Sequence, residues 1–227
     1  MSETVQLKSA DGFVFPAYLA RPAGKAKGAV VVLQEIFGVN SHIRAVADGY
    51  ADKGYLALAP ATFHRAKQGV ELGYTPQDIQ AGAALKAQVE ALPAPGVMPD
   101  IEAAIQYAAQ AGKVGVVGYC WGGLLAWRSA CLLQGLAAAS PYYGGGMTVG
   151  AEAGRKPMCP VLCHFGDQDH AIALETVEAF KKAQTQVDVQ IYHANHGFNC
   201  DQRGSYDAAA AELARERTLA FFARHVG

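Results

Sequence analysis

Gly118-Tyr119-Cys120-Trp121-Gly122-Gly123 joins an apolar run at residues 113–117 to a helical pattern at residues 124–133. Strand, Gly-x-Cys-x-Gly and helix, in that order, form a nucleophile elbow with sulfur where serine usually stands. The sharp turn forces the cysteine outward, and small neighbours let the chain segments pass closely. The helix N-terminus offers unpaired N–H groups that favour a thiolate and a developing oxyanion. The segment therefore predicts a strand–turn–helix unit that presents Cys120 for chemistry.

From residue 29 onward, the chain alternates strand-like and helix-like segments. Expected strands lie at 29–33, 55–59, 114–118, 136–142, 161–165 and 188–192, and expected helices at 41–53, 76–91, 99–111, 124–133, 174–183 and 205–225. This alternation predicts an α/β fold whose central sheet is mostly parallel and has helices on both faces. Two earlier strands at 4–7 and 13–20, joined at Asp11-Gly12, predict an N-terminal antiparallel hairpin.

Length and composition fit one α/β domain over residues 1–227, with half of the residues hydrophobic. Nineteen Lys and Arg residues against 20 Asp and Glu residues argue against a nucleic-acid surface or a polybasic membrane anchor. The longest uncharged run, 129–151, is broken by glycines and a proline, so no membrane span is expected. Five irregularly spaced cysteines and no signal-peptide pattern favour reduced thiols and a cytoplasmic protein.

Two further residues follow expected strands in the order that a thiol triad needs. Asp169 lies in a turn after 161–165, and His196 lies after 188–192. The carboxyl ends of parallel strands share one edge of the sheet, where open α/β sheets gather their sites. Cys120 would attack a carbonyl, His196 would relay protons, and Asp169 would orient the ring.

Each partner of the cysteine has a rival nearby in the sequence. His193 competes with His196 for the proton-relay role, and Asp167 competes with Asp169 for the acid role. Cys120 itself has the alternative of a buried structural thiol. The triad assignment therefore depends on which of these side chains meet in space.

A second group of cysteine and histidine residues invites comparison with a metal site. Cys159, Cys163 and His164 lie close in sequence, with His170 and Cys200 further on, but their spacing fits no standard zinc finger. Cys163 and His164 are neighbours in an expected strand and would point to opposite faces. We therefore expect no metal site and no cofactor.

The chain resembles the dienelactone hydrolase family (carboxymethylenebutenolidases and their relatives), which has the α/β-hydrolase fold. The resemblance spans about residues 29–200. Its matching segments are Gln34-Glu35-Ile36-Phe37-Gly38, Ala59-Pro60, the elbow around Cys120, Tyr142-Tyr143-Gly144, Gly166-Asp167-Gln168-Asp169 and His196-Gly197-Phe198. A cysteine elbow together with the Gln-Glu-Ile-Phe-Gly segment is unusual for a generic esterase.

The resemblance implies a role for Glu35, which in such enzymes contacts the resting thiol and helps to activate it when substrate arrives. A carboxylate after a buried strand would lie in poor solvent, where proton exchange with a thiol is feasible. The resemblance also places the oxyanion hole at the backbone N–H groups of Ile36 and Trp121. Candidate substrate contacts, each with core packing as its alternative, are Phe37, Trp121, Tyr142, Tyr143 and Phe198.

The resemblance is weakest at the arginines that bind the substrate carboxylate in this family. Residues 71–90, where one is expected, contain no arginine, and Cys200 stands four residues after His196, where the other is expected. Arg65 and Arg203 are the remaining candidates, since arginine is the best bidentate partner of a carboxylate. The resemblance thus supports the type of reaction more strongly than it supports the identity of the substrate.

These inferences predict a monomeric hydrolase that opens a small-molecule lactone or ester through a thioester on Cys120. Alternatives are a relative acting on a different ester or thioester, a thiol-dependent acyl transferase or amidase, and a noncatalytic lactone-binding protein.

Overall fold

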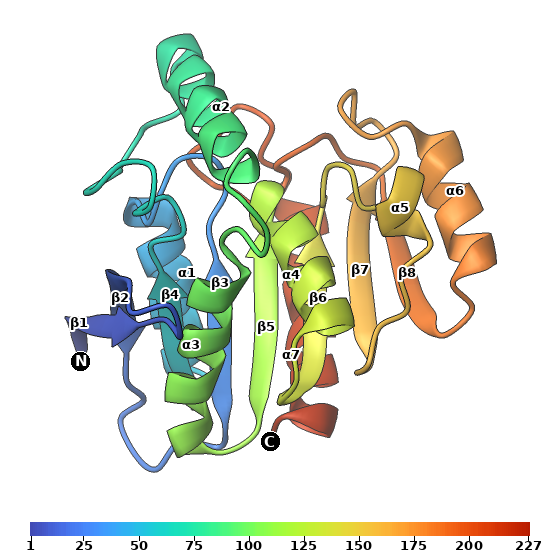
Figure 1. Ribbon diagram of the computed structural model, residues 1–227. Helices are drawn as coiled ribbons and strands as arrows, with labels where there is room; N and C mark the ends of the chain where they lie inside the picture. The colour runs from blue at the N-terminus through green and yellow to red at the C-terminus, as the bar shows by residue number, and fades with distance from the viewer.

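Eight strands form a single sheet in the order β1-β2-β4-β3-β5-β6-β7-β8, in which β2 runs opposite to the other strands (Figure 1). The computed structural model describes residues 1–227. β1 pairs with β2 and β2 with β4 in antiparallel fashion, and all other pairs are parallel. The predicted parallel sheet with its N-terminal hairpin is confirmed. The strands are β1 (Ser2–Lys8), β2 (Val14–Ala20), β3 (Ala29–Leu33), β4 (Leu56–Pro60), β5 (Val114–Tyr119), β6 (Leu136–Tyr142), β7 (Val161–Gly166) and β8 (Val187–Tyr192).

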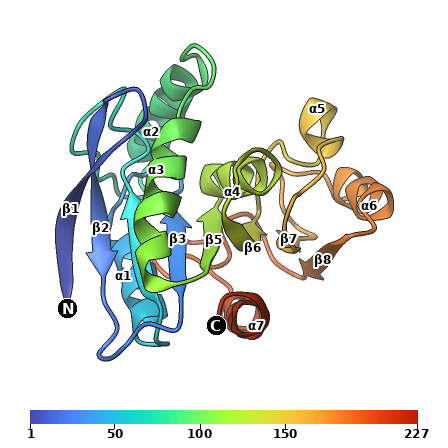
Figure 2. The same cartoon turned by 60° about the horizontal axis from the view of Figure 1, so that its bottom comes forward.

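The central strands are buried on both faces because helices cover each side of the sheet. Every residue of β3, β4, β5 and β7 is buried, in keeping with their apolar sequences. Figure 2 shows α1 and α7 on one side of the sheet and α3, α4 and α6 on the other. The helices are α1 (Ser41–Ala51), α2 (Pro76–Glu90), α3 (Met98–Ala108), α4 (Trp121–Leu132), α5 (Gly150–Ala153), α6 (Leu174–Ala183) and α7 (Ala208–His225), and a 3₁₀ turn follows α3 at Ala109–Ala111.

Local capping fixes where several helices begin. The Asn40 side chain accepts a hydrogen bond from the N–H of Ile43, which starts α1 directly after the loop that follows β3. Thr75 and Asp78 form a reciprocal capping box at the start of α2. The expected helix start at residue 205 is wrong by three residues, because Asp207 caps α7 by accepting from Ala210.

Helix α2 lies beyond the carboxyl edge of the sheet, over the loop that follows β3 (Figure 1). A β-carbon on Gly82 of α2 would lie 2.2 Å from the carbonyl oxygen of Ile36, so only glycine permits this approach. The short helix α5 falls in a region expected to be loop, where a single turn leaves no periodic pattern. None of the helices has both the length and the apolar content needed to cross a lipid bilayer.

A buried polar network ties β6, β7 and β8 to α7. His164 on β7 is fully buried, with Nδ1 2.8 Å from the Tyr192 hydroxyl and Nε2 2.9 Å from Oγ1 of Thr218. The Tyr142 hydroxyl lies 2.7 Å from the same Thr218 oxygen. Burial, aided by the charge of Arg217, lowers the pKa of His164 to about 3. The network therefore holds His164 as a neutral ring.

The protein is expected to lose stability in mild acid because of His164. Between its ordinary pKa of 6.5 and its folded value of about 3, the unfolded chain binds a proton that the folded chain does not. The free energy of unfolding therefore falls as pH falls, by about 2 kcal/mol at about pH 5 from this residue alone. Urea unfolding across this range should show a shallower pH dependence in His164→Gln than in the wild type. Equal slopes in the two proteins would contradict this account.

Candidate active site

Cys120 occupies a strained position between β5 and α4. Its φ of 54° and ψ of −116° lie outside the usual regions for a residue with a side chain. A β-carbon on Gly122 would lie 2.4 Å from the carbonyl oxygens of Leu33 and Gln34, so the elbow packs directly against the end of β3. This is the tight strand-to-helix turn that the sequence predicts, with a cysteine at its apex.

The structure brings His196 and Asp169 together at the same edge of the sheet. Nδ1 of His196 lies 2.7 Å from Oδ2 of Asp169, whose side chain is fully buried. The other carboxylate oxygen accepts hydrogen bonds from the N–H groups of Ala171, at 2.8 Å, and Ile172, at 3.1 Å. Asp169 is therefore fixed in place, and it directs the Nε2 side of the imidazole away from itself.

Cys120 lies near enough to this imidazole to influence its charge. Burial opposes a charge on the ring, but the charge and hydrogen bond of Cys120, together with Asp169, raise the pKa of His196 to about 10. A ring with this pKa is protonated at neutral pH. Protonated His196 would favour negative charge on a neighbouring sulfur.

The rival residues pair with each other at the surface. Nδ1 of His193 lies 3.2 Å from Oδ2 of Asp167, and 80% of the His193 side chain is exposed. Asp167 and His193 therefore form a solvated pair that contacts neither Asp169 nor His196 through a hydrogen bond. Of the two candidate acids and the two candidate histidines, Asp169 and His196 form the buried pair.

The other four cysteines are poor nucleophiles for a common reason. Burial raises the pKa of the Cys131 thiol to about 12 and that of Cys159 to about 11. It also raises the pKa of Cys200 to about 11, with help from the Glu35 charge, and places the pKa of Cys163 well above its ordinary value. At neutral pH these thiols stay protonated, and a thiol is far less reactive than a thiolate.

Two backbone N–H groups flank the elbow and could stabilise an oxyanion. Trp121 is the first residue of α4, where a helix leaves its N–H groups without partners inside the helix. The N–H of Ile36 donates to no backbone or side-chain acceptor. Because the elbow packs against the end of β3, these two segments are neighbours. Unpartnered backbone N–H groups are the donors from which an oxyanion hole is built, so Ile36 and Trp121 stay candidates for that role.

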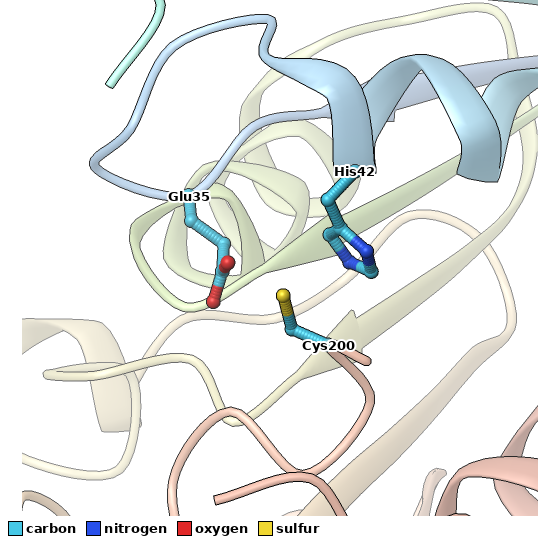
Figure 3. Close-up of side chains that lie close together, drawn as sticks. All are labelled: Glu35, His42 and Cys200. Carbon is cyan, nitrogen blue, oxygen red and sulfur yellow. The ribbon is translucent and has the colours of Figure 1, made fainter. Parts of the chain in front are cut away.

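Glu35 lies in the loop after β3 and is bound by Arg203. The guanidinium Nη1 donates to Oε1 of Glu35 at 2.8 Å, while Oε2 is buried without a hydrogen-bond partner. Burial works against the charge of Arg203, but the charge of Glu35, with smaller effects from Tyr143 and Cys120, raises the pKa of that guanidinium. Figure 3 shows the carboxylate of Glu35 turned toward His42 and Cys200.

The sequence as a whole matches the model of the dienelactone hydrolase family over residues 15–226. The chain belongs to the dienelactone hydrolase family. Membership supports hydrolysis of an ester or lactone as the class of activity.

Individual relatives of the family cover nearly all of the chain. A carboxymethylenebutenolidase of Pseudomonas putida is 34% identical over 232 residues, covering 98% of this chain and 97% of the relative. A Synechocystis protein named "Putative carboxymethylenebutenolidase" is 38% identical and covers 90% of this chain and 89% of its own. A crystal structure from Klebsiella pneumoniae, described as "Putative Dienelactone Hydrolase", is 31% identical, with a TM-score of 0.81 and coverage of 99% and 100%.

Within this dienelactone hydrolase fold, Arg65 is not free to bind a substrate carboxylate. Its Nε and Nη2 donate to the two oxygens of Asp100 at 2.8 and 2.7 Å, and its Nη1 lies 2.8 Å from Asp11. All three guanidinium nitrogens are thus engaged by carboxylates. The structure therefore does not support the expected role of Arg65 in substrate binding, whereas Arg203 remains beside the site through Glu35.

Tyr142 and Tyr143, neighbours in sequence, face different surroundings. Tyr142 belongs to the core, because its hydroxyl bonds to Thr218 in the buried network, so its expected contact with substrate is not supported. Tyr143 has φ of 34°, and its ring meets the edge of the His196 ring at 5.1 Å. Its buried hydroxyl has no hydrogen-bond partner. Tyr143 therefore lies against the catalytic candidates.

The remaining aromatic candidates are packed into the protein. Phe37 contacts Tyr74, with ring centroids 4.6 Å apart, and Phe198 contacts Tyr143 at 5.2 Å. The Trp121 ring stacks on Phe63, and its Nε1 donates to Glu90 at 2.7 Å. The three rings of Phe37, Phe198 and Trp121 are almost completely buried. They shape the walls around the elbow from within the core.

Sequence reasoning missed the surroundings of Glu35. Arg203 was expected to bind an anionic substrate, not Glu35, and Cys200 was grouped with Cys159 and Cys163. In the structure, Cys200 lies with Glu35 and His42. Glu35 is separated from both Cys200 and Arg203 by about 160 residues of chain, and no local sequence spacing predicts contacts over such a separation.

Proposed function

We propose that the protein hydrolyses a lactone or ester through a thioester on Cys120, with His196 and Asp169 completing the triad. The observation that carries this proposal is the strained Cys120 elbow at the same edge of the sheet as an imidazole held 2.7 Å from the buried Asp169. Nucleophile, orienting acid and proton relay then occur in the chain order of α/β-hydrolases. Family membership supports the same class of reaction.

Acylation begins with attack of the Cys120 thiolate on the carbonyl carbon. The carbonyl π-electrons move onto oxygen, and the N–H groups of Ile36 and Trp121 stabilise that oxyanion. When the tetrahedral adduct collapses, the carbon–oxygen bond of the ester breaks. The imidazolium of His196 supplies a proton to the leaving alkoxide or enolate, and a thioester remains.

Deacylation reverses these roles with water. Neutral His196 takes a proton from a water molecule as its oxygen attacks the thioester carbonyl. The second adduct expels the Cys120 thiolate, which regains its ion pair with the imidazolium and releases the carboxylic acid. Asp169 keeps the Nδ1 proton of His196 in place throughout, so Nε2 always faces the reacting groups.

Glu35 is proposed to change partners during the cycle. In the structure its Oε1 is bound by Arg203, and its Oε2 is buried without a partner. An entering anionic substrate would compete with Glu35 for Arg203. The released carboxylate would then add a negative charge beside the Cys120–His196 pair, which favours the imidazolium that acylation needs and so couples substrate entry to catalysis.

The proposal is tested by relating thiol modification to turnover. Purified protein should hydrolyse a dienelactone or an activated aryl ester, and iodoacetamide should abolish turnover in proportion to alkylation of Cys120. A slowly hydrolysed substrate should protect Cys120 from labelling. Full activity of the fully alkylated enzyme would refute the proposed mechanism, and turnover of amides alone would redirect it to an amidase.

Arg203 is expected to discriminate between charged and neutral substrates. A charge-assisted hydrogen bond is worth about 1.5–3 kcal/mol, which corresponds to roughly 10- to 100-fold in binding. Arg203→Gln should therefore raise KM for a lactone that carries a carboxylate by about that factor and change KM for a neutral ester little. An equal change for both substrates would argue against carboxylate recognition by Arg203.

A further inference from the structure

Three potential metal ligands from distant parts of the chain meet beside the elbow. Glu35 comes from the loop after β3, His42 from the first turn of α1, and Cys200 from the segment between β8 and α7 (Figure 3). One ligand atom from each residue lies within 4.8 Å of the other two. A carboxylate oxygen, an imidazole nitrogen and a sulfur thus face a common point.

The cluster is buried, and two of its polar atoms lack partners. Glu35 is 1% exposed and His42 is 4% exposed, and Cys200 is fully buried. Oε2 of Glu35 and Nε2 of His42 make no hydrogen bond. A buried polar atom without a partner is destabilising, because it has given up its hydrogen bonds to water. Two such atoms belong to residues of the same cluster, which indicates that a further partner satisfies them when the site is in use.

Asp201 can orient the His42 ring in the way that a hydrogen-bonded carboxylate orients a histidine that binds a metal ion. Its Oδ1 lies 3.2 Å from Nδ1 of His42. Because a carboxylate only accepts hydrogen bonds, the proton of a neutral His42 ring belongs on Nδ1, and the Nε2 lone pair then points into the cluster. Carboxylate, histidine and ion in this order are the common arrangement around protein-bound zinc.

We propose that Glu35, His42 and Cys200 bind a thiophilic divalent cation of the Zn²⁺ type. Mixed oxygen, nitrogen and sulfur ligands suit Zn²⁺, and three protein ligands leave a fourth position for water. Ligand atoms around a tetrahedral zinc lie roughly 3.5 Å apart, so the side chains would close in by about 1 Å. The Glu35 carboxylate and the Cys200 thiolate balance the two charges of the ion.

An open cleft adjoins the cluster. This cleft, of about 590 Å³ between α1 and α7, is lined by His42 and Asp201, so an ion would reach the cluster past the His42 side chain. Arg203 opposes a cation nearby, but it binds Oε1 of Glu35 and leaves Oε2 free. A bound ion would hold Glu35 in its position beside Arg203. On the proposed mechanism, the ion would therefore inhibit hydrolysis by preventing Glu35 from changing partners.

The test measures metal binding in the absence of the reactive thiol. Cys120→Ala removes the other thiol–imidazole pair that could hold zinc. After chelator treatment and dialysis, the C120A protein should bind one equivalent of Zn²⁺, and Co²⁺ in its place should show thiolate-to-metal charge-transfer absorption. In the C120A background, Cys200→Ser should abolish that absorption and His42→Gln should weaken binding at least tenfold. Asp201→Asn should weaken it roughly 10- to 100-fold.

Cys159→Ser in the C120A background is the matched control and should bind as C120A does. Circular dichroism and thermal melting establish that each variant is folded, and His42→Gln and Asp201→Asn decide the matter if Cys200→Ser does not fold. No stoichiometric Zn²⁺ binding by C120A, or binding unchanged in the folded ligand variants, would overturn the proposal. Because binding is measured without turnover, failure here leaves the proposed hydrolytic mechanism intact, and failure of that mechanism leaves this site intact.

Discussion

Cys120→Ala is expected to lower kcat/KM for the best lactone or ester substrate by about 10⁴-fold or more. Without the sulfur no thioester can form, and the two candidate N–H groups can only polarise the carbonyl toward water. Steady-state kinetics with saturating and limiting substrate should show the loss mainly in kcat. Because the Cys120 side chain belongs to a strained turn, alanine there should leave thermal stability close to that of the wild type.

Cys131→Ala provides the matched control, since Cys131 lies in the last turn of α4, whereas Cys120 directly precedes that helix. It should retain wild-type kinetics. Retention of substantial hydrolysis by folded Cys120→Ala would show that another residue is the nucleophile. Cys120→Ser should be strongly impaired too, because the surroundings suit a thiolate, and a serine hydroxyl stays protonated near neutral pH.

Asp169→Asn is expected to lower kcat by on the order of 10³-fold or more with a smaller change in KM. The amide that replaces the carboxylate could present its NH₂ group to Nδ1 of His196, which would move the ring proton to Nε2 and remove the base that faces the sulfur. The carboxylate also supports the pKa of His196 of about 10, so that pKa should fall. NMR titration of the ring carbon-bound protons measures this shift independently of activity.

Asp167→Asn is the control for this change, because Asp167 makes the same type of contact with the exposed His193. It should leave kcat and the titration of His196 unchanged. If Asp167→Asn lowered kcat more than Asp169→Asn does, the catalytic acid and histidine would have to be the surface pair of Asp167 and His193.

Local sequence signals were sufficient to predict the sheet and the position of the elbow. The runs of β3, β5 and β7 are almost entirely apolar, and Gly118, Gly122 and Gly123 mark a turn where close approach of the backbone excludes side chains. Asp169 and His196 could be placed because each follows a strand of a parallel sheet, and the ends of such strands converge.

Contacts between loops could not be predicted in this way. Arg65 looked available for a ligand, but Asp100, 35 residues later, and Asp11 bind all of its guanidinium nitrogens. Arg203 and Cys200 meet Glu35 only because the segment before α7 folds back over the β3 loop. Neither periodicity nor spacing records such a path, since irregular segments have no repeating geometry.

The central claim is that the acyl group of the substrate passes through the sulfur of Cys120. Enzyme mixed with a slowly hydrolysed aryl ester, quenched in acid within the first turnovers and digested, should yield the Cys120 peptide with the mass of the acyl group added. The adduct should be released by neutral hydroxylamine, as a thioester is, and it should accumulate further in Asp169→Asn if attack by water slows more than attack by sulfur. An acyl group found on any other residue, or rapid turnover without acylation of Cys120 at any time point, would contradict the mechanism.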